Sequence, residues 1–148
     1  MFEFLQPANR LAERLVRPFE SLFLLATRLY VAWQFLKSGW LKVASWENTL
    51  FLFQEEYRTP LLPPALAAVA GTAAELVFPS LLIVGLASRW AAAGLFAVNL
   101  VAVASYAHVL LAEGFEAALA QHVLWGFMLL VLVVFGPGRL ALDSLRAR

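Results

Sequence analysis

The chain has 148 residues, of which 62% are hydrophobic and 14% are charged, and its mean hydropathy is +0.77. Soluble domains are typically about 45–50% apolar and about 25% charged, so this composition excludes an ordinary soluble domain and indicates that much of the surface faces lipid. The formal net charge of +1 argues against a nucleic-acid-binding protein, and the absence of cysteine excludes disulfides and thiolate metal sites.

Four long apolar segments predict membrane-spanning α-helices. They are rich in Ala and Leu and lack the alternation of apolar and polar residues that marks barrel strands. A helix needs about 20 apolar residues to cross the hydrocarbon core. The second and third segments meet this length, whereas the first and fourth are shorter or interrupted by polar residues. The predicted spans are residues 21–39, 64–87, 90–111 and 118–135.

The connection between the first and second spans has a helical pattern of its own, over residues 45–57. Large apolar side chains form a rough stripe opposite a polar stripe, a pattern typical of a short helix lying on the membrane surface. We therefore expect residues 1–148 to form a single all-α domain, an integral membrane four-helix bundle with a short interfacial helix between the first and second spans. The apolar stripe comprises Trp46, Leu50, Phe51 and Phe53, and the polar stripe comprises Glu47, Asn48, Glu55 and Glu56.

Arginine and lysine are unevenly distributed between the two ends of the predicted spans. One side has seven arginines, whereas the other has Lys42, Arg58 and, near its edge, Lys37. Cytoplasmic flanks carry the excess of Lys and Arg, so we expect a bacterial inner-membrane protein with both termini in the cytoplasm. The seven arginines are Arg10, Arg14, Arg17, Arg89, Arg139, Arg146 and Arg148.

Two ionisable residues, Arg28 and Glu75, fall inside predicted spans. A charge at mid-membrane costs at least about 2.5–3.5 kcal/mol on insertion scales, so such residues usually face the bundle interior and pair. At 1.5 Å per residue, Arg28 is expected about 12 Å and Glu75 about 18–20 Å above the cytoplasmic edge, a difference that an arginine side chain can bridge. We therefore predict an Arg28–Glu75 pair, with Asn99 of the third span completing the network.

A second polar cluster is expected near the outer ends of the third and fourth spans. His108 lies late in the third span and His122 early in the fourth, and the short turn between them brings both to a similar depth, near Tyr106 and Lys42. Two histidines can bind a metal or a haem or shuttle protons, but without a third ligand they make a poor metal site, and no metal is assigned. The alternative is that they are interfacial histidines at helix ends.

Four motifs follow one another in an order that is similar to a known family. Arg28 of the first span is followed by SGWLKV (Ser38–Val43), then by a Trp-containing segment, SWENTLFLFQEEYRTPLLPP. The second span carries AAEL (Ala73–Leu76), and the tail reads GPGRLALD (Gly136–Asp143). Over about residues 22–145, the chain resembles the DoxX family of small bacterial four-helix membrane proteins.

This resemblance places Glu75 at the family's acidic position, whereas Ala141 stands where the family usually has serine. The long segment before the second span looks most like the proteobacterial branch that is often encoded beside metal-responsive peptide-modifying proteins. The resemblance also implies a link to quinone-coupled sulfur oxidation and to membrane redox complexes that handle oxidative stress. The family's biochemical activity is mostly unassigned, so the resemblance bears on the fold more than on the function.

Three functional hypotheses remain open. The first is an oxidoreductase-associated inner-membrane subunit of a redox-linked complex, in which Arg28 and Glu75 organise a polar cavity for a quinone or for protons. The second is a non-catalytic anchor or assembly module, in which the same pair only sets helix register. The third is a transporter component for metal–peptide complexes, which two Met, two His and no Cys disfavour. Expected partners are the lipid bilayer and other subunits or a second copy, through small residues such as Ala91–Gly94.

Overall fold

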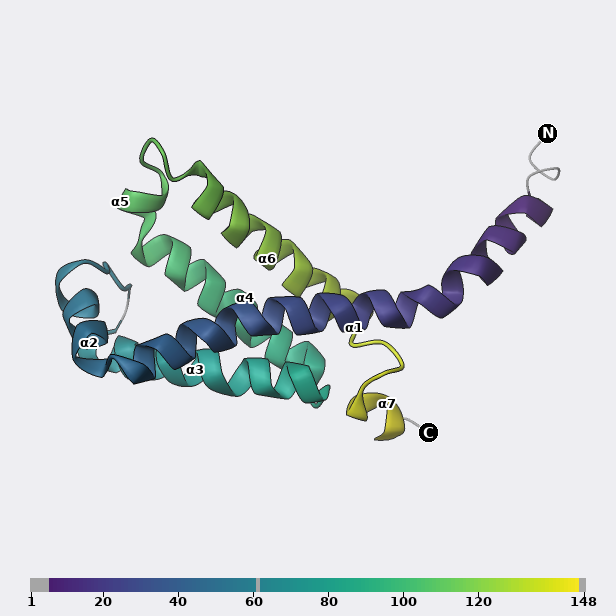
Figure 1. Cartoon of the computed structure of the whole chain (residues 1–148), viewed down its shortest axis with the longest axis horizontal. Coiled ribbons are helices and arrows are strands. Elements are labelled where there is room, and N and C mark those ends of the chain that lie inside the picture. The colour runs from purple at the N-terminus through teal and green to yellow at the C-terminus, as the bar shows by residue number, and fades with distance from the viewer. Residues whose placement is uncertain (1–5, 61, 147–148) are drawn as a thin grey trace.

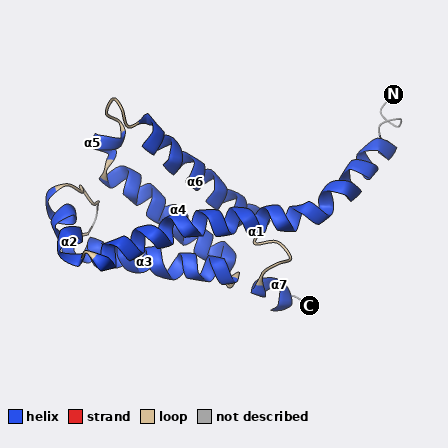
Figure 2. Cartoon of the chain, in the orientation of Figure 1, coloured by secondary structure: helices blue, strands red, loops and turns tan. Residues whose placement is uncertain are grey.

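A computed structural model describes residues 6–60 and 62–146, and within these ranges the chain forms seven helices and no strand (Figures 1 and 2). Arg148, one of the seven arginines that predict the orientation, lies outside the described residues. The helices are α1 (Gln6–Ala44), α2 (Trp46–Glu55), α3 (Pro64–Val84), α4 (Ser88–Ser105), α5 (Ala107–Leu110), α6 (Glu116–Phe135) and α7 (Leu142–Arg146).

Three of these helices, α3, α4 and α6, are long and apolar enough to cross a membrane. They correspond to the second, third and fourth predicted spans, so the prediction of an all-helical membrane protein is confirmed. The third span is shorter than predicted, because the helix ends at Ser105 and a separate turn, α5, follows Tyr106. The first helix is longer than predicted at both ends: α1 has 39 residues and a proline, Pro18, in its interior.

The core of the bundle lies where α1, α3, α4 and α6 meet. In Figure 1, α1 runs alongside α3, and α4 and α6 form the opposite pair. Small residues allow close contact: a Cβ built on Gly94 would lie 2.6 Å from the Phe78 ring. The Ala91–Gly94 stretch is therefore an internal helix contact, and the prediction that it is free for self-association is wrong. The buried core residues are Leu24, Val31, Ala32, Phe35, Leu82, Ala91, Ala92, Leu95, Leu129 and Leu132.

The short helix predicted in the first connection is present as α2. It packs on the first turns of α3, where Phe53 is buried against Ala67 and Ala68. The chain after α2 then reaches α4, where the Arg58 N–H donates to the Ser105 carbonyl (2.9 Å). The location of α2 on the membrane surface stays a prediction.

The C-terminal tail folds back against the turn between α3 and α4, an arrangement we call the C-terminal clasp. The Asp143 carboxylate accepts hydrogen bonds from the N–H groups of Ala87 and Ser88, both at 2.8 Å, at the start of α4. The Asp143 N–H donates to the Gly85 carbonyl (2.9 Å). Helix N-termini leave such N–H groups without partners, so the tail caps α4 from 55 residues away.

Candidate functional site

Glu75 forms an ion pair with Lys42, and the predicted Arg28–Glu75 pair is wrong. The Lys42 ammonium donates to the Glu75 carboxylate and, at 3.0 Å, to the hydroxyl of Ser38 one turn earlier on α1. The two charged side chains are only 19% and 9% exposed. Charges in a membrane bundle usually pair in this way, but the cation comes from the far end of α1.

Helix register explains why Arg28 does not reach Glu75. A Cβ built on Gly39 would lie 3.0 Å from the Cβ of Glu75, whereas one built on Gly85 would lie 2.6 Å from the Nη1 atom of Arg28. Arg28 is therefore level with the end of α3. Ten residues of helix separate Gly85 from Glu75, or about 15 Å, which is beyond the reach of the arginine side chain.

Arg28 belongs to the C-terminal clasp. Its Nη2 group donates to the Leu140 carbonyl (2.9 Å), and Asp143 attracts its charge. The side chain is 2% exposed, and its Nε and Nη1 groups have no hydrogen-bond partner among the described residues. Two of the motifs that carry the family resemblance, the arginine of the first helix and GPGRLALD of the tail, are thus in contact through Arg28 and Leu140.

Asn99 pairs with His122, and not with Glu75 as predicted. The Asn99 Nδ2 group donates to the His122 backbone carbonyl (2.9 Å), so its Oδ1 atom faces the imidazole Nδ1 at 2.8 Å. A carbonyl oxygen only accepts, so His122 carries a proton on Nδ1 and, when neutral, has an acceptor lone pair on Nε2. The imidazole also packs edge-on against Trp125, whose ring contacts Phe35 (centroids 5.0 and 5.9 Å).

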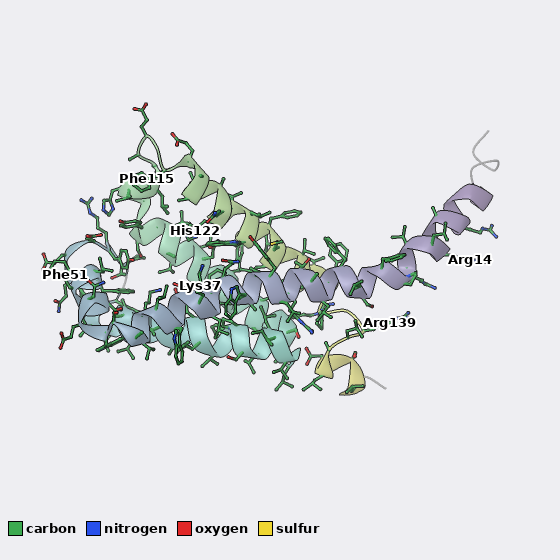
Figure 3. The ribbon with its side chains drawn as sticks, in the orientation of Figure 1. Arg14, Lys37, Phe51, Phe115, His122 and Arg139 are labelled. Atoms are coloured by element: carbon green, nitrogen blue, oxygen red, sulfur yellow. The ribbon has the colours of Figure 1, made fainter. Side chains whose placement is uncertain are left out.

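The two polar pairs lie at one level of the bundle. Phe35 of α1 contacts Trp125 of α6, and the two helices run in opposite directions. Ser38, three residues after Phe35, and His122, three residues before Trp125, therefore lie at a similar depth. Gly39, next to Ser38, contacts Glu75. Figure 3 places His122 on α6 and Lys37 on α1 at a similar position along the molecule. We call this set the polar layer: Ser38, Lys42, Glu75, Asn99 and His122.

His108 and Tyr106 lie elsewhere, just after the C-terminal end of α4. His108 is exposed and packs edge-on against Tyr106 (5.5 Å), which in turn packs on Tyr57 (5.2 Å). His108 and His122 therefore have different partners and make no joint site. No group of three His, Asp or Glu side chains suited to a metal ion occurs among the residues that the structure describes.

Tyr57 is a polar residue of this region that the sequence did not single out. Its ring packs between Phe53 and Tyr106, and burial, with the nearby Tyr106, Glu56 and Glu75 groups, raises the pKa of its phenol above the ordinary value. Ser38 was also missed, although its position four residues before Lys42 is the spacing at which helix neighbours meet.

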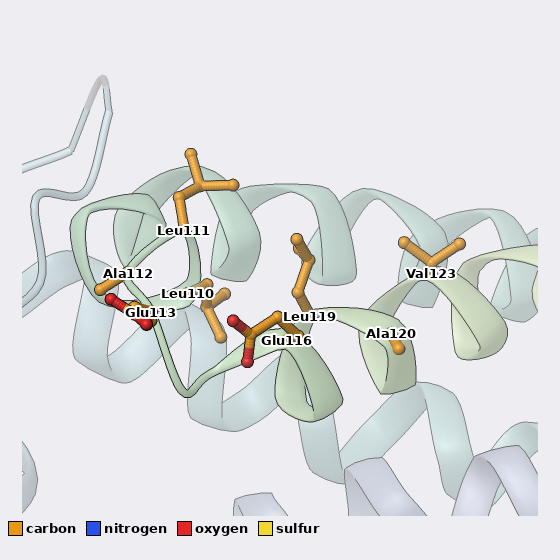
Figure 4. Close-up of a pocket in the computed structure, with 8 residues that line it drawn as sticks. All are labelled: Leu110, Leu111, Ala112, Glu113, Glu116, Leu119, Ala120 and Val123. Carbon is orange, nitrogen blue, oxygen red and sulfur yellow. The ribbon is translucent and has the colours of Figure 1, made fainter.

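An open groove lies apart from the polar layer, at the turn between α5 and α6 (Figure 4). Its lining is mostly apolar and includes Leu110, Leu119 and Val123, with Glu113 and Glu116 at the turn. None of the predicted site residues lines this groove. The polar layer therefore remains the main candidate site.

Comparisons with known proteins identify the family of this chain. The DoxX family model matches residues 23–108, which run from α1 into α5. A Haemophilus influenzae protein named only as an uncharacterized protein is 32% identical over 130 residues, covering 82% of each chain. No solved structure matches. The family match covers more than half of the chain, and this membrane protein belongs to the DoxX family.

Proposed function

We propose that this protein is a membrane subunit of a redox-linked complex, and that its polar layer binds the head group of a quinone. The observation that carries the proposal is the Lys42–Glu75 ion pair, which lies among apolar helices at the middle of α3. Such a pair places a strong donor and a strong acceptor side by side within lipid-facing helices. A quinone head group, with two carbonyl oxygens in an apolar ring, matches both the donor and the surroundings.

Two buried polar atoms, one near Glu75 and one near His122, support a ligand at this level. The Thr72 hydroxyl, one turn from Glu75 on α3, is buried and has no hydrogen-bond partner within residues 6–60 and 62–146. The Trp125 indole N–H, one turn from His122, is buried and without a partner in the same ranges. Buried polar groups are rarely left unpaired, so each atom indicates a missing partner such as a ligand oxygen or a water.

The residues of the polar layer divide the chemistry between them. A bound quinone would supply the ability to accept and donate two electrons. The Lys42 ammonium would donate a hydrogen bond to a ligand oxygen, and the Glu75 carboxylate and the Nε2 atom of His122 would each accept one of the two protons that a bound quinol loses when it passes two electrons to a redox partner in the complex. Asn99 holds the imidazole in the tautomer that leaves Nε2 free to accept.

Photolabelling of the protein in lipid nanodiscs with a short-chain azido-ubiquinone, mapped by mass spectrometry, tests the proposal. We expect labelled peptides around Ser38–Lys42 and Thr72–Glu75. Lys42→Met removes a charge-assisted hydrogen bond and should weaken competition by unmodified ubiquinone about tenfold or more. The matched control is Lys37→Met, because Lys37 is an exposed lysine on the same helix.

Two results would remove the quinone proposal. One is labelling confined to peptides outside the polar layer, and the other is equal competition in the Lys42→Met and Lys37→Met proteins. Either result favours a non-catalytic anchor. A specific observation supports that second function: Lys42 and Glu75 already satisfy one another and lock α1 against α3.

The membrane topology is part of the proposal. We take α1 from Ser21 to Ala44 as a fourth span, because this part of the helix packs along α3, and we place both termini in the cytoplasm of a bacterial inner membrane. Fusion of green fluorescent protein or alkaline phosphatase to the C-terminus tests the orientation. An active phosphatase fusion together with a non-fluorescent fluorescent-protein fusion would show that the C-terminus lies outside the cytoplasm, and would reverse the proposed orientation.

A further inference from the structure

The first part of α1 extends beyond the helix bundle (Figure 1). The Ser21 hydroxyl accepts from the Arg139 N–H (3.3 Å) and Leu24 lies against Gly138, so α1 is packed against the tail from Ser21 onward. Every residue from 12 to 20 is exposed. We call residues 6–20 the N-terminal arm.

The N-terminal arm has one apolar and one charged face. Leu15, Val16 and Phe19 fall within one arc of the helix, and each is more than 60% exposed. The opposite arc carries Arg14 and Arg17 (Arg14 is labelled in Figure 3). It also carries Arg10 and Glu13, whereas Glu20 borders the apolar arc, one turn after Val16. Large apolar side chains exposed together in this way mark a surface that something else covers.

The position of the arm points to lipid as the cover. Its apolar face continues directly into Leu22 and Phe23, which are exposed on the outside of the bundle. Pro18, inside the helix, lacks an N–H and weakens the helix there, so the arm can turn relative to the bundle. Figure 1 shows the first part of α1 already leaving the direction of the rest.

We propose that the N-terminal arm lies on the adjoining leaflet of the membrane and binds anionic phospholipid. Leu15, Val16 and Phe19 enter the boundary between head groups and acyl chains. Arg14 and Arg17 stay at the surface, where they meet phosphate groups. This interaction is independent of the polar layer.

The absence of cysteine makes the test direct, because one introduced cysteine gives one label. Nitroxide labels at Val16→Cys and Phe19→Cys, and at Arg14→Cys and Arg17→Cys, are compared in vesicles of phosphatidylethanolamine with phosphatidylglycerol. The ratio of collisions with oxygen to collisions with a water-soluble nickel complex reports immersion. We expect this ratio to be several-fold higher at the first pair of positions. A label at Trp33→Cys, on the exposed side of the bundle, reports correct insertion.

The lipid dependence is tested with phosphatidylcholine vesicles and with the double variant Arg14→Gln/Arg17→Gln. Both changes should lower the oxygen-to-nickel ratio at position 19, while Arg58→Gln, in the connection after α2, should leave it unchanged. Equal ratios in both lipids would overturn the anionic-lipid assignment. Nickel access at all four positions would show a solvated arm. Loss of access to both reagents at positions 16 and 19 would show a protein cover. Either outcome overturns the proposal.

Discussion

Removing one member of the Lys42–Glu75 pair should cost far more than removing both. Lys42→Met leaves the Glu75 carboxylate, 9% exposed, without its counter-ion. Breaking a buried pair typically costs 3–5 kcal/mol, and because the Lys42 side chain is 19% exposed we expect the low end, about 3 kcal/mol. Glu75→Leu should cost about 2 kcal/mol, since the long lysine side chain can turn back toward water. The double replacement should be within about 1 kcal/mol of the native protein.

The free energies of unfolding are to be measured by SDS titration in mixed micelles, followed by circular dichroism, for the four proteins of the cycle. These values correspond to a coupling energy of about 4 kcal/mol or more. Lys37→Met, which changes an exposed lysine, should lie within about 0.5 kcal/mol of the native protein. Additive single effects would refute the reasoning, because they would mean that the two charges do not depend on each other for burial.

The C-terminal clasp and Tyr57 give three further predictions. Asp143→Ala removes the cap of α4 and the anion beside Arg28, and should lower the free energy of unfolding by about 2 kcal/mol in the same titration; a change below 0.5 kcal/mol, on the order of a surface substitution, would contradict the capping role. Gly85→Ala should cost more than about 2 kcal/mol, because Gly85 has φ 78° and its new Cβ would clash with the Nη1 atom of Arg28. Gly114→Ala is the control, with φ 92° but open space around it, and equal losses would rule out the clash. Because the pKa of Tyr57 is raised, the folded state keeps its phenol protonated where an unfolded tyrosine ionises, near pH 10, so stability falls as the pH rises above that value. Tyr57→Phe should reduce this alkaline loss, and an unchanged pH profile would exclude the effect.

Hydropathy alone located the membrane helices, because each must bury its own backbone hydrogen bonds and keep apolar side chains against lipid. The predicted segments 64–87 and 118–135 match α3 and α6 closely. The short helix in the first connection was also predictable, from the periodicity of its apolar residues. The ends of α1 were not, because its N-terminal arm is too polar to resemble a span and its last turns carry Lys42.

The partners of the charged residues were decided by tertiary structure. Sequence indicated that Arg28 and Glu75 each need a partner, since neither charge is stable alone in hydrocarbon. It did not indicate which partner, because the depths were counted from span edges that hydropathy places only approximately, and a few residues of error move a side chain by a helical turn. The family resemblance placed the tail motif in the same pattern as Arg28 without showing their contact.

Composition and periodicity thus determined that this chain is a helical membrane protein and which residues had to be paired. The packing of α1 against α3 decided that Glu75 meets Lys42, and the return of the tail decided that Arg28 meets Leu140 and Asp143. The physical reason is that the free energy of burying a charge depends on one side chain and its segment. Which residues pair depends instead on the offset and rotation between two helices. These are set by side-chain packing across the bundle, which no single segment contains.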